Sequence, residues 1–189
     1  MKKLLCLSLV LLACVVANAK TTITVVDGDF TIAKNPEVVA SIEVDFSEAT
    51  VDDKPLNVYF EDKTEKNKAD WDEDIEDGRN IFGKKWNKVM KKGKGMQLLN
   101  STEAPYRMVI KVKKLSLGST AASVMFGNWG GGANMSGDIL LYDNNNNLVL
   151  DVDFFDVSGD SSYTEGGRIY NVFEQTANYV ANYLKRMKQ

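Results

Sequence analysis

The stretch MSGDILLYDNNNNLVLDVDFFDV, residues 135–157, decides the fold because it predicts two β-strands joined by a short turn. Apolar and polar residues alternate on both sides of DNNNN (143–147), as in strands that bury one face. Asparagine tolerates the left-handed backbone angles that a hairpin loop needs. The preceding YRMVIKVKKLSL (106–117) alternates in the same way. We therefore expect an antiparallel meander of three neighbouring strands.

Three stretches upstream of the meander predict further strands. PEVVASIEVDFSEA (36–49) alternates between apolar and polar or charged residues, which is typical of a half-buried strand. TTITVVDGD (21–29) and LNVYFED (56–62) are shorter apolar segments bounded by polar residues, and we expect a short strand in each.

The segment between these strands and the meander predicts an amphipathic helix over residues 70–92. Asp70 with Glu73 has the spacing of an N-terminal capping pair, and Gly93 stands where a left-handed C-terminal residue is favoured. One apolar stripe recurs at steps of three or four residues: Trp71, Ile75, Gly78, Phe82, Trp86 and Val89.

The last segment, residues 166–189, predicts a second amphipathic helix. Its stripe consists of Ile169, Val172, Phe173, Thr176, Val180, Tyr183, Leu184 and Met187. The simplest packing that hides all of these faces is an α+β fold. We expect a mostly antiparallel sheet of about five or six strands with the two helices on one face.

The N-terminus predicts an export signal over residues 1–19, because two lysines precede an apolar run that ends in an A-x-A cleavage site. Residues 20–189 would then form a single exported α+β domain, periplasmic or secreted. The apolar run is shorter than the roughly 20 residues of a membrane-spanning helix. Without Lys2 and Lys3 the 26 acidic side chains outnumber the basic ones, which argues against nucleic acid as a partner.

A lipid anchor is the alternative, because LLAC (11–14) resembles a bacterial lipobox in which Cys14 is acylated. The protein would then be an outer-membrane lipoprotein, and this lipid would be its contact with the membrane. Against lipidation, the residues that follow Cys14 are apolar rather than polar. Both Cys6 and Cys14 lie in the signal, so the domain carries no disulfide and no thiol nucleophile.

The composition excludes the commonest catalytic sites. The chain contains no histidine, so neither a Ser-His-Asp site nor the usual zinc ligand sets can form. We expect no cofactor and no enzymatic activity. A pair of carboxylates acting as a hydrolase, such as a glycosidase, stays open as the alternative.

Two acidic stretches raise the question of a metal site. The 143–147 loop has a D-x-N-x-N pattern but carries Leu148 and Phe154 where an EF-hand needs glycine and an acid. The carboxylates at the start of the 70–92 helix are adjacent, so they point in different directions. We therefore expect a plain hairpin, a solvated helix start and no metal site.

One end of the predicted sheet is the candidate binding surface. Antiparallel strands bring the loops at 118–134 and 158–167 to the same end, together with the start of the last helix. Helix N–H groups, hydroxyls and an aromatic ring there would suit an anion or a sugar. Alternatively, the glycines of 125–138 only allow a tight bend, with the tryptophan folded onto the sheet edge. The candidate ligand-binding residues are Asn128, Trp129, Asn134, Asp160, Ser161, Tyr163 and Arg168.

Four of these segments carry a resemblance: VDFSEA (44–49), YRMVIKV (106–112), GNWGGGANMSGDILLYD (127–143) and NYVANYLK (178–185). Together they resemble a group of exported lipoproteins of Gram-negative bacteria, whose α/β domain is similar to the periplasmic domains of the TolB and curli-secretion proteins. The resemblance implies an envelope location and carries over no catalytic residue. We expect a non-catalytic cell-envelope protein that binds an envelope protein, a glycan or a small anion in envelope assembly.

Overall fold

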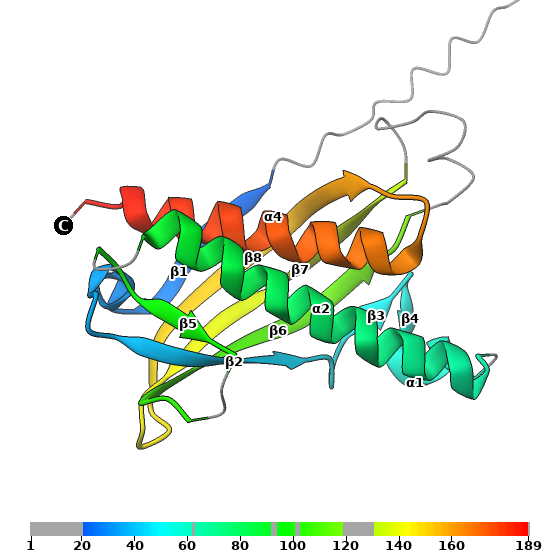
Figure 1. The fold of residues 1–189 in the computed structure, drawn as a ribbon, viewed down its shortest axis with the longest axis horizontal. Helices are drawn as coiled ribbons and strands as arrows, with labels where there is room; N and C mark the ends of the chain where they lie inside the picture. The colour runs from blue at the N-terminus through cyan, green and yellow to red at the C-terminus, as the bar shows by residue number, and fades with distance from the viewer. Residues whose placement is uncertain (1–20, 62, 92–93, 101–102, 119–130, 189) are drawn as a thin grey trace, which may run out of the picture.

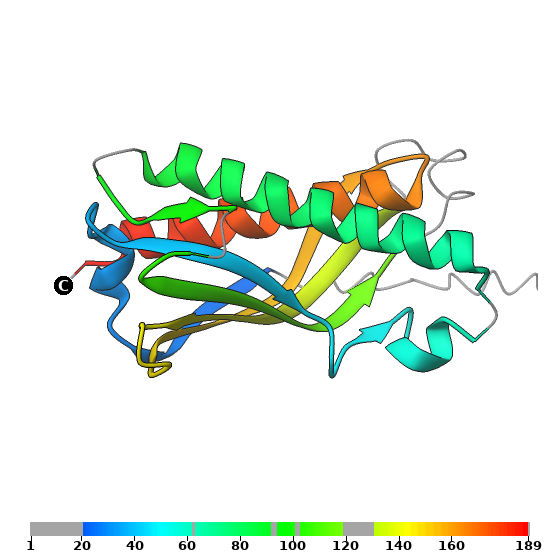
Figure 2. The same cartoon turned by 60° about the horizontal axis from the view of Figure 1, so that its bottom comes forward.

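The computed structural model describes residues 21–61, 63–91, 94–100, 103–118 and 131–188. It is an α+β fold in which an eight-stranded mixed sheet packs against two long helices, α2 (Glu65–Met90) and α4 (Glu165–Arg186). Both helices lie on the same face of the sheet, and neither of the two long helices covers the opposite face (Figures 1 and 2). The predictions for residues 1–19, Gly93, Asn128 and Trp129 fall outside the described residues.

The sheet has a main path of six strands in the order β1-β8-β7-β6-β2-β5. Their bounds are β1 Thr22–Gly28, β2 Val39–Asp45, β5 Gln97–Leu99, β6 Tyr106–Ser116, β7 Gly132–Tyr142 and β8 Leu148–Ser161. The two-residue strands β3 (Thr50–Val51) and β4 (Lys54–Pro55) pair with each other beside this path, and β3 also pairs with β6. A 3-10 helix, η1 (Phe30–Lys34), follows β1.

The predicted meander is confirmed. Strands β6, β7 and β8 are neighbours and pair antiparallel, with Ile139 opposite Ile110 on one side and opposite Val152 on the other. The hairpin between β7 and β8 is also confirmed, since the Asp143 carboxylate accepts hydrogen bonds from its own loop and Asn146 has a left-handed φ of 62°. The hydrogen bonds of the Asp143 carboxylate thus join the two ends of the loop.

The prediction of an α+β fold with a mostly antiparallel sheet holds in outline, and the structure adds parallel pairings, because β2 pairs parallel with both β5 and β6, and β3 pairs parallel with β6. The cause is the long helix. After β2 the chain crosses the sheet as α2 and returns as β5, and a strand that returns through a helical crossover lies parallel to the first strand.

The strand predicted at 56–62 is wrong, because this segment begins with the one-turn helix α1 (Leu56–Tyr59). Leu56, Tyr59 and Phe60 are spaced as on one face of a helix, and all three pack against the core. The apolar run was too short for its period to distinguish a helix from a strand.

The start of α2 also differs from the prediction. The helix begins at Glu65 with Thr64 as its N-cap, and Thr64 forms a reciprocal capping box with Asn67. Asp70 and Glu73 therefore lie inside the helix rather than at its start. The added first turn is polar throughout, so the apolar stripe gave no sign of it.

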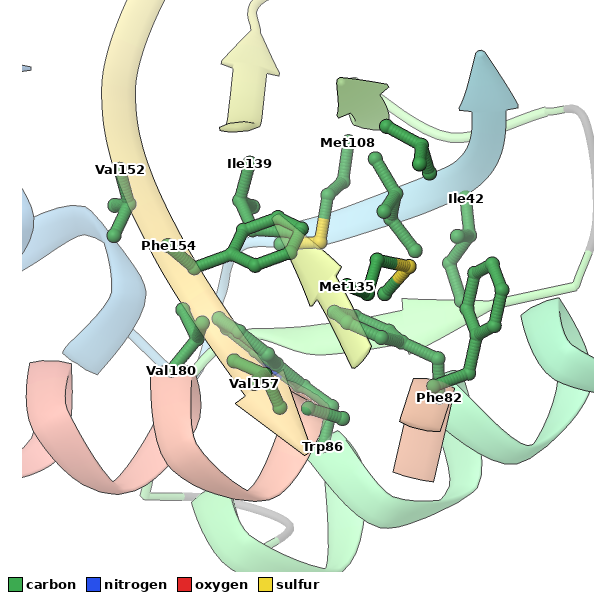
Figure 3. Close-up of a cluster of buried hydrophobic side chains, with 14 of the residues drawn as sticks. Ile42, Phe82, Trp86, Met108, Met135, Ile139, Val152, Phe154, Val157 and Val180 are labelled. Atoms are coloured by element: carbon green, nitrogen blue, oxygen red, sulfur yellow. The ribbon is translucent and has the colours of Figure 1, made fainter. Parts of the chain in front are cut away.

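The core lies between the sheet and the helix pair. Figure 3 shows Met108, Ile139, Val152 and Phe154 from the strands directed toward Trp86 and its neighbours on the helices. The predicted stripes are largely confirmed, since both helices bury apolar residues along one face. The buried positions are Trp71, Gly78, Phe82, Gly83, Trp86 and Met90 of α2, and Ile169, Val172, Phe173, Thr176, Ala177, Val180, Ala181 and Leu184 of α4, with Arg168 at its start.

Candidate functional site

The sequence-predicted surface occupies the end of the sheet where β7 begins, β8 ends and α4 starts. Gly132 pairs with Ser161 at this end, and only residues 162–164 separate β8 from α4. The connection is shorter than the predicted 158–167 loop because β8 continues to Ser161. Gly131, at the described end of the glycine-rich stretch, has a φ of 92°, which favours glycine and supports the interpretation of this segment as a bend.

Several of the candidate residues serve the fold at this end. The Asn134 Oδ1 accepts a hydrogen bond of 2.5 Å from the Ser158 hydroxyl, and the main-chain oxygen of Asp160 accepts one of 3.0 Å from the Asn171 side chain. Ser161 is the last residue of β8. These contacts join β7 to β8 and β8 to α4.

Arg168 and Tyr163 differ most in exposure. Arg168 is only 4% exposed, and its Nη1 donates 2.9 Å to the main-chain oxygen of Ser162, so it fastens the loop to α4. Tyr163 is 72% exposed and presents its ring to solvent. Of the described candidates, Tyr163 is therefore the side chain best placed to meet a ligand.

A groove of about 600 Å³ lies next to this surface, and the sequence did not predict it. It runs between α1, the first half of α2 and the start of α4, elements that meet at one end of the molecule (Figure 2). Its lining residues are Tyr59, Phe60, Lys63, Asn67, Asp70, Trp71, Glu73, Asp74, Asp77, Thr164, Glu165, Gly166, Gly167 and Tyr170.

Three aromatic rings of the groove lining lie close together. The rings of Tyr59 and Phe60 lie 5.7 and 5.5 Å from the ring of Trp71, measured between centroids. The Tyr59 hydroxyl donates a 2.7 Å hydrogen bond to Oε1 of Glu165 in the first turn of α4. Burial raises the pKa of Tyr59 well above its usual value, and the hydrogen bond and charge of Glu165 add to this. Tyr59 therefore stays protonated and holds α1 against α4.

Four carboxylates of the lining, Asp70, Glu73, Asp74 and Asp77, follow one another along α2. Asp74 lies directly against the first turn of α4. A Cβ added to Gly166 of α4 would lie only 2.0 Å from Oδ1 of Asp74. Burial, followed by the negative charge of Glu165, raises the pKa of Asp74. The Asp74 side chain thus contacts the first turn of α4 and lies near other negatively charged carboxylates.

The chemistry of the groove follows from its lining. Five carboxylates face a single ammonium group, that of Lys63, whose Nζ lies 4.5 Å from the centre of the Tyr59 ring. Such a lining repels anions and favours hydroxyl-rich or cationic groups. Among the described residues no set of three or more metal-ligating side chains converges on one point. The described helices also include none with the length and apolar character needed to cross a bilayer.

Comparison with known proteins gives distant structural neighbours. No protein-family model matches the chain, and a search of curated proteins finds no match. Among solved structures, the PelC dodecamer from Paraburkholderia phytofirmans has 13% identity and a TM-score of 0.45, and a point variant of it has 12% identity and a TM-score of 0.43. Each match covers 89% of this chain and 99% of the other. The likeness is distant.

Proposed function

We propose that the chain is a non-catalytic exported protein of the cell envelope that acts by binding, and that its ligand occupies the groove between α1, α2 and the start of α4. The observation that carries the proposal is that aromatic rings and carboxylates line one groove of about 600 Å³. The elements that line the groove are held together, since α2 and α4 pack on each other and the Tyr59 hydroxyl donates a hydrogen bond to Glu165.

A glycan is the ligand that this lining favours. Aromatic rings stack on the apolar face of a sugar, and carboxylates accept hydrogen bonds from its hydroxyls. A small anion, one of the ligands expected from the sequence, is disfavoured here because five carboxylates would repel it. A basic segment of an envelope protein is the other partner that would suit the groove, because its positive charges would pair with the carboxylates of the lining.

The proposed location rests on the sequence of residues 1–19, with its A-x-A site, and on the resemblance to exported lipoprotein domains. Mass spectrometry of the N-terminus of protein isolated from cells distinguishes the two forms. A chain that begins at Lys20 supports a periplasmic or secreted protein, and an acylated Cys14 supports an outer-membrane lipoprotein.

The predicted surface at the end of the sheet adjoins the groove through the first turn of α4. We propose that Tyr163 and Trp129 extend the binding surface beyond the groove. The proposal predicts that Trp129→Ala weakens ligand capture, and Tyr163→Ala tests the same extension on a described residue that is 72% exposed.

The hydrolase alternative has one observation in its favour. Asp74 is a partly buried carboxyl with a raised pKa, the property that a general acid needs, and it stands among other carboxylates in the groove. This arrangement makes Asp74 the first residue to test for catalysis.

One experiment separates binding from hydrolysis. The purified protein is titrated with soluble envelope glycans by calorimetry, and the same mixtures are analysed for cleaved products by mass spectrometry. We expect Tyr170→Ala, in the groove and 39% exposed, to weaken binding by about tenfold. The matched control is Tyr179→Ala on the same helix, 44% exposed and outside the groove, which should bind as the unmodified chain does. Product formation that Asp74→Asn abolishes would replace the binding proposal with the hydrolase.

A further inference from the structure

The cations of this chain are distributed unevenly, although the chain is acidic overall with a formal net charge of −3. On the sheet, Lys111, Lys113 and Lys114 each pair with a carboxylate. Toward the C-terminal ends of α2 and α4, six exposed cations form no ion pair with a described carboxylate. These cations, which we call the basic end, are Lys84, Lys88, Lys91, Lys94, Arg186 and Lys188.

The two helices and η1 bring these cations to one end of the molecule. Near the starts of the helices, Gly166 of α4 lies against Asp74 of α2. Near their ends, Nζ of Lys185 donates a 2.9 Å hydrogen bond to the main-chain oxygen of Val89, so the helices run in the same direction. The side chain of Lys34 in η1 donates to the main chain just after α4. Figures 1 and 2 show both helices ending beside η1, at the end opposite the carboxylate-lined groove.

The requirements of the helices do not account for this charge. Lysine complements the helix dipole in the last turn only, yet Lys84 precedes the last turn of α2, and Lys94 and Lys188 follow the helices. Lys84 and Lys88 lie one turn apart, a spacing at which like charges destabilise a helix. The carboxylates that flank η1 are fewer than the cations: Asp27, Asp29 and Glu37. The basic end therefore favours an anionic partner.

An amphipathic groove adjoins the basic end. It has a volume of about 650 Å³, lies between β1 and the second half of α4, and includes Arg186 in its lining. Tyr179, Tyr183 and Met187 also line it, and Tyr179 is 44% exposed. Tyrosine is favoured where the apolar part of a bilayer meets water. Thr21, the first described residue, lines the same groove, so the chain enters the fold beside this surface.

We propose that the basic end docks on a bilayer that contains anionic phospholipid. The lysines pair with the phosphate groups, and the tyrosines of the adjoining groove lie at the level of the headgroups. Cys14 precedes Thr21 by seven residues, which span at most about 25 Å. An acyl chain on Cys14 would therefore enter the bilayer on which the basic end docks, and one acyl chain with a basic patch gives stable anchoring. The inference rests on the proposed envelope location.

Docking by this end also orients the proposed binding groove. Helix α2 has 26 residues and is therefore about 39 Å long, with the carboxylate-lined groove along its first half. The Debye length at physiological salt is only about 8 Å. The carboxylates of the groove thus escape repulsion by the phosphates, and the groove stays accessible to a ligand.

The test measures co-sedimentation of the purified chain with phospholipid vesicles. The chain carries Cys14→Ser, which removes any acyl chain, so that binding reports the folded surface alone. One set of vesicles is phosphatidylcholine, and the other contains about one third phosphatidylglycerol. We expect the anionic vesicles to bind at least about tenfold more strongly, and we expect this binding to weaken as salt is added.

Two charge reversals locate the surface. Lys88→Glu with Lys94→Glu should weaken binding to the anionic vesicles by more than about tenfold. The matched control is Lys66→Glu with Lys68→Glu at the start of α2, which changes the net charge equally and should bind as the unmodified chain does. Circular dichroism confirms that each variant is folded.

Three results would overturn the proposal: no binding to the anionic vesicles, equal binding to both kinds of vesicle, or equal loss of binding in the two charge reversals. Glycan binding is measured separately without vesicles. A chain that binds glycan but not vesicles would refute the docking surface and leave the proposed function standing.

Discussion

Asp74 lies against the first turn of α4, where burial and the charges of Glu165 and Asp70 raise its pKa. Like charges at this spacing on a helix are unfavourable, and Asp70 and Asp77 stand one turn to either side of Asp74. Its ionisation therefore opposes folding. A natural chain that keeps such a carboxyl in a groove is consistent with a role for it in binding.

Asp74→Asn is expected to stabilise the protein at neutral pH by about 0.5 kcal/mol, since it removes like-charge contacts within the helix. A raised folded pKa means that the native state binds more protons than the unfolded state between about pH 3.9 and the folded pKa. The gain in unfolding free energy from Asp74→Asn should reach its full value above the pKa of Asp74 in the folded chain, and it should vanish below about pH 3.9. Urea unfolding at several pH values measures it, and a difference that grows toward acid pH would contradict this account.

Tyr59→Phe removes the hydroxyl that donates 2.7 Å to Glu165 and leaves the ring contacts with Trp71 in place. We expect a loss of about 1 kcal/mol in unfolding free energy, the usual net value of such a hydrogen bond. Tyr163→Phe, at a residue that is 72% exposed, is the control and should change stability by less than about 0.5 kcal/mol. Equal effects of the two substitutions in chemical denaturation would show that the bond to Glu165 is unimportant.

Elements of this fold differ in how far their sequences specify them. Strands β6 to β8 and both helix stripes follow from local periodicity, which is strong over long amphipathic segments. The 56–62 segment is too short for the spacing of its apolar residues to distinguish a helix from a strand. Its helical turn packs against Trp71. The Thr64 cap lies in polar sequence without an apolar stripe, so the true start of α2 could not be located.

The contact between α2 and α4 depends on Gly78, which is buried at their crossing. A Cβ at this position would lie 2.8 Å from Cδ2 of Phe173 on α4. Alanine gains about 1 kcal/mol in helix propensity, but overpacking a filled core costs about 1 to 3 kcal/mol. Gly78→Ala should therefore lower stability by about 1 kcal/mol, measured by thermal or urea unfolding. Lys84→Ala, at an exposed position of the same helix, is the control and should have little effect on stability. A Gly78→Ala chain that is more stable than the unmodified chain would contradict this, because it would show that α2 and α4 can move apart with no loss of unfolding free energy.

At the scale of the whole molecule, the antiparallel meander was enough to bring the start of α4 to the end of the sheet where β7 begins. The parallel pairing of β2 with β5 and β6 could not be predicted, because it depends on where α2 returns the chain. The groove was missed for the same reason. Tyr59, Asp74 and Glu165 are far apart in sequence, and no local pattern indicates that α1 folds beneath α2 and against α4.

The most direct test of the binding account is hydrogen–deuterium exchange of the purified protein with and without a soluble envelope glycan extract. Binding in the groove should slow exchange in peptides covering residues 63–77 and 163–170, which come from the two helices that line it. The 143–147 hairpin, at the opposite end of the sheet from the start of α4, should not change. Slower exchange in both helical segments is the predicted result, and unchanged exchange there while the extract binds elsewhere would contradict the proposed site.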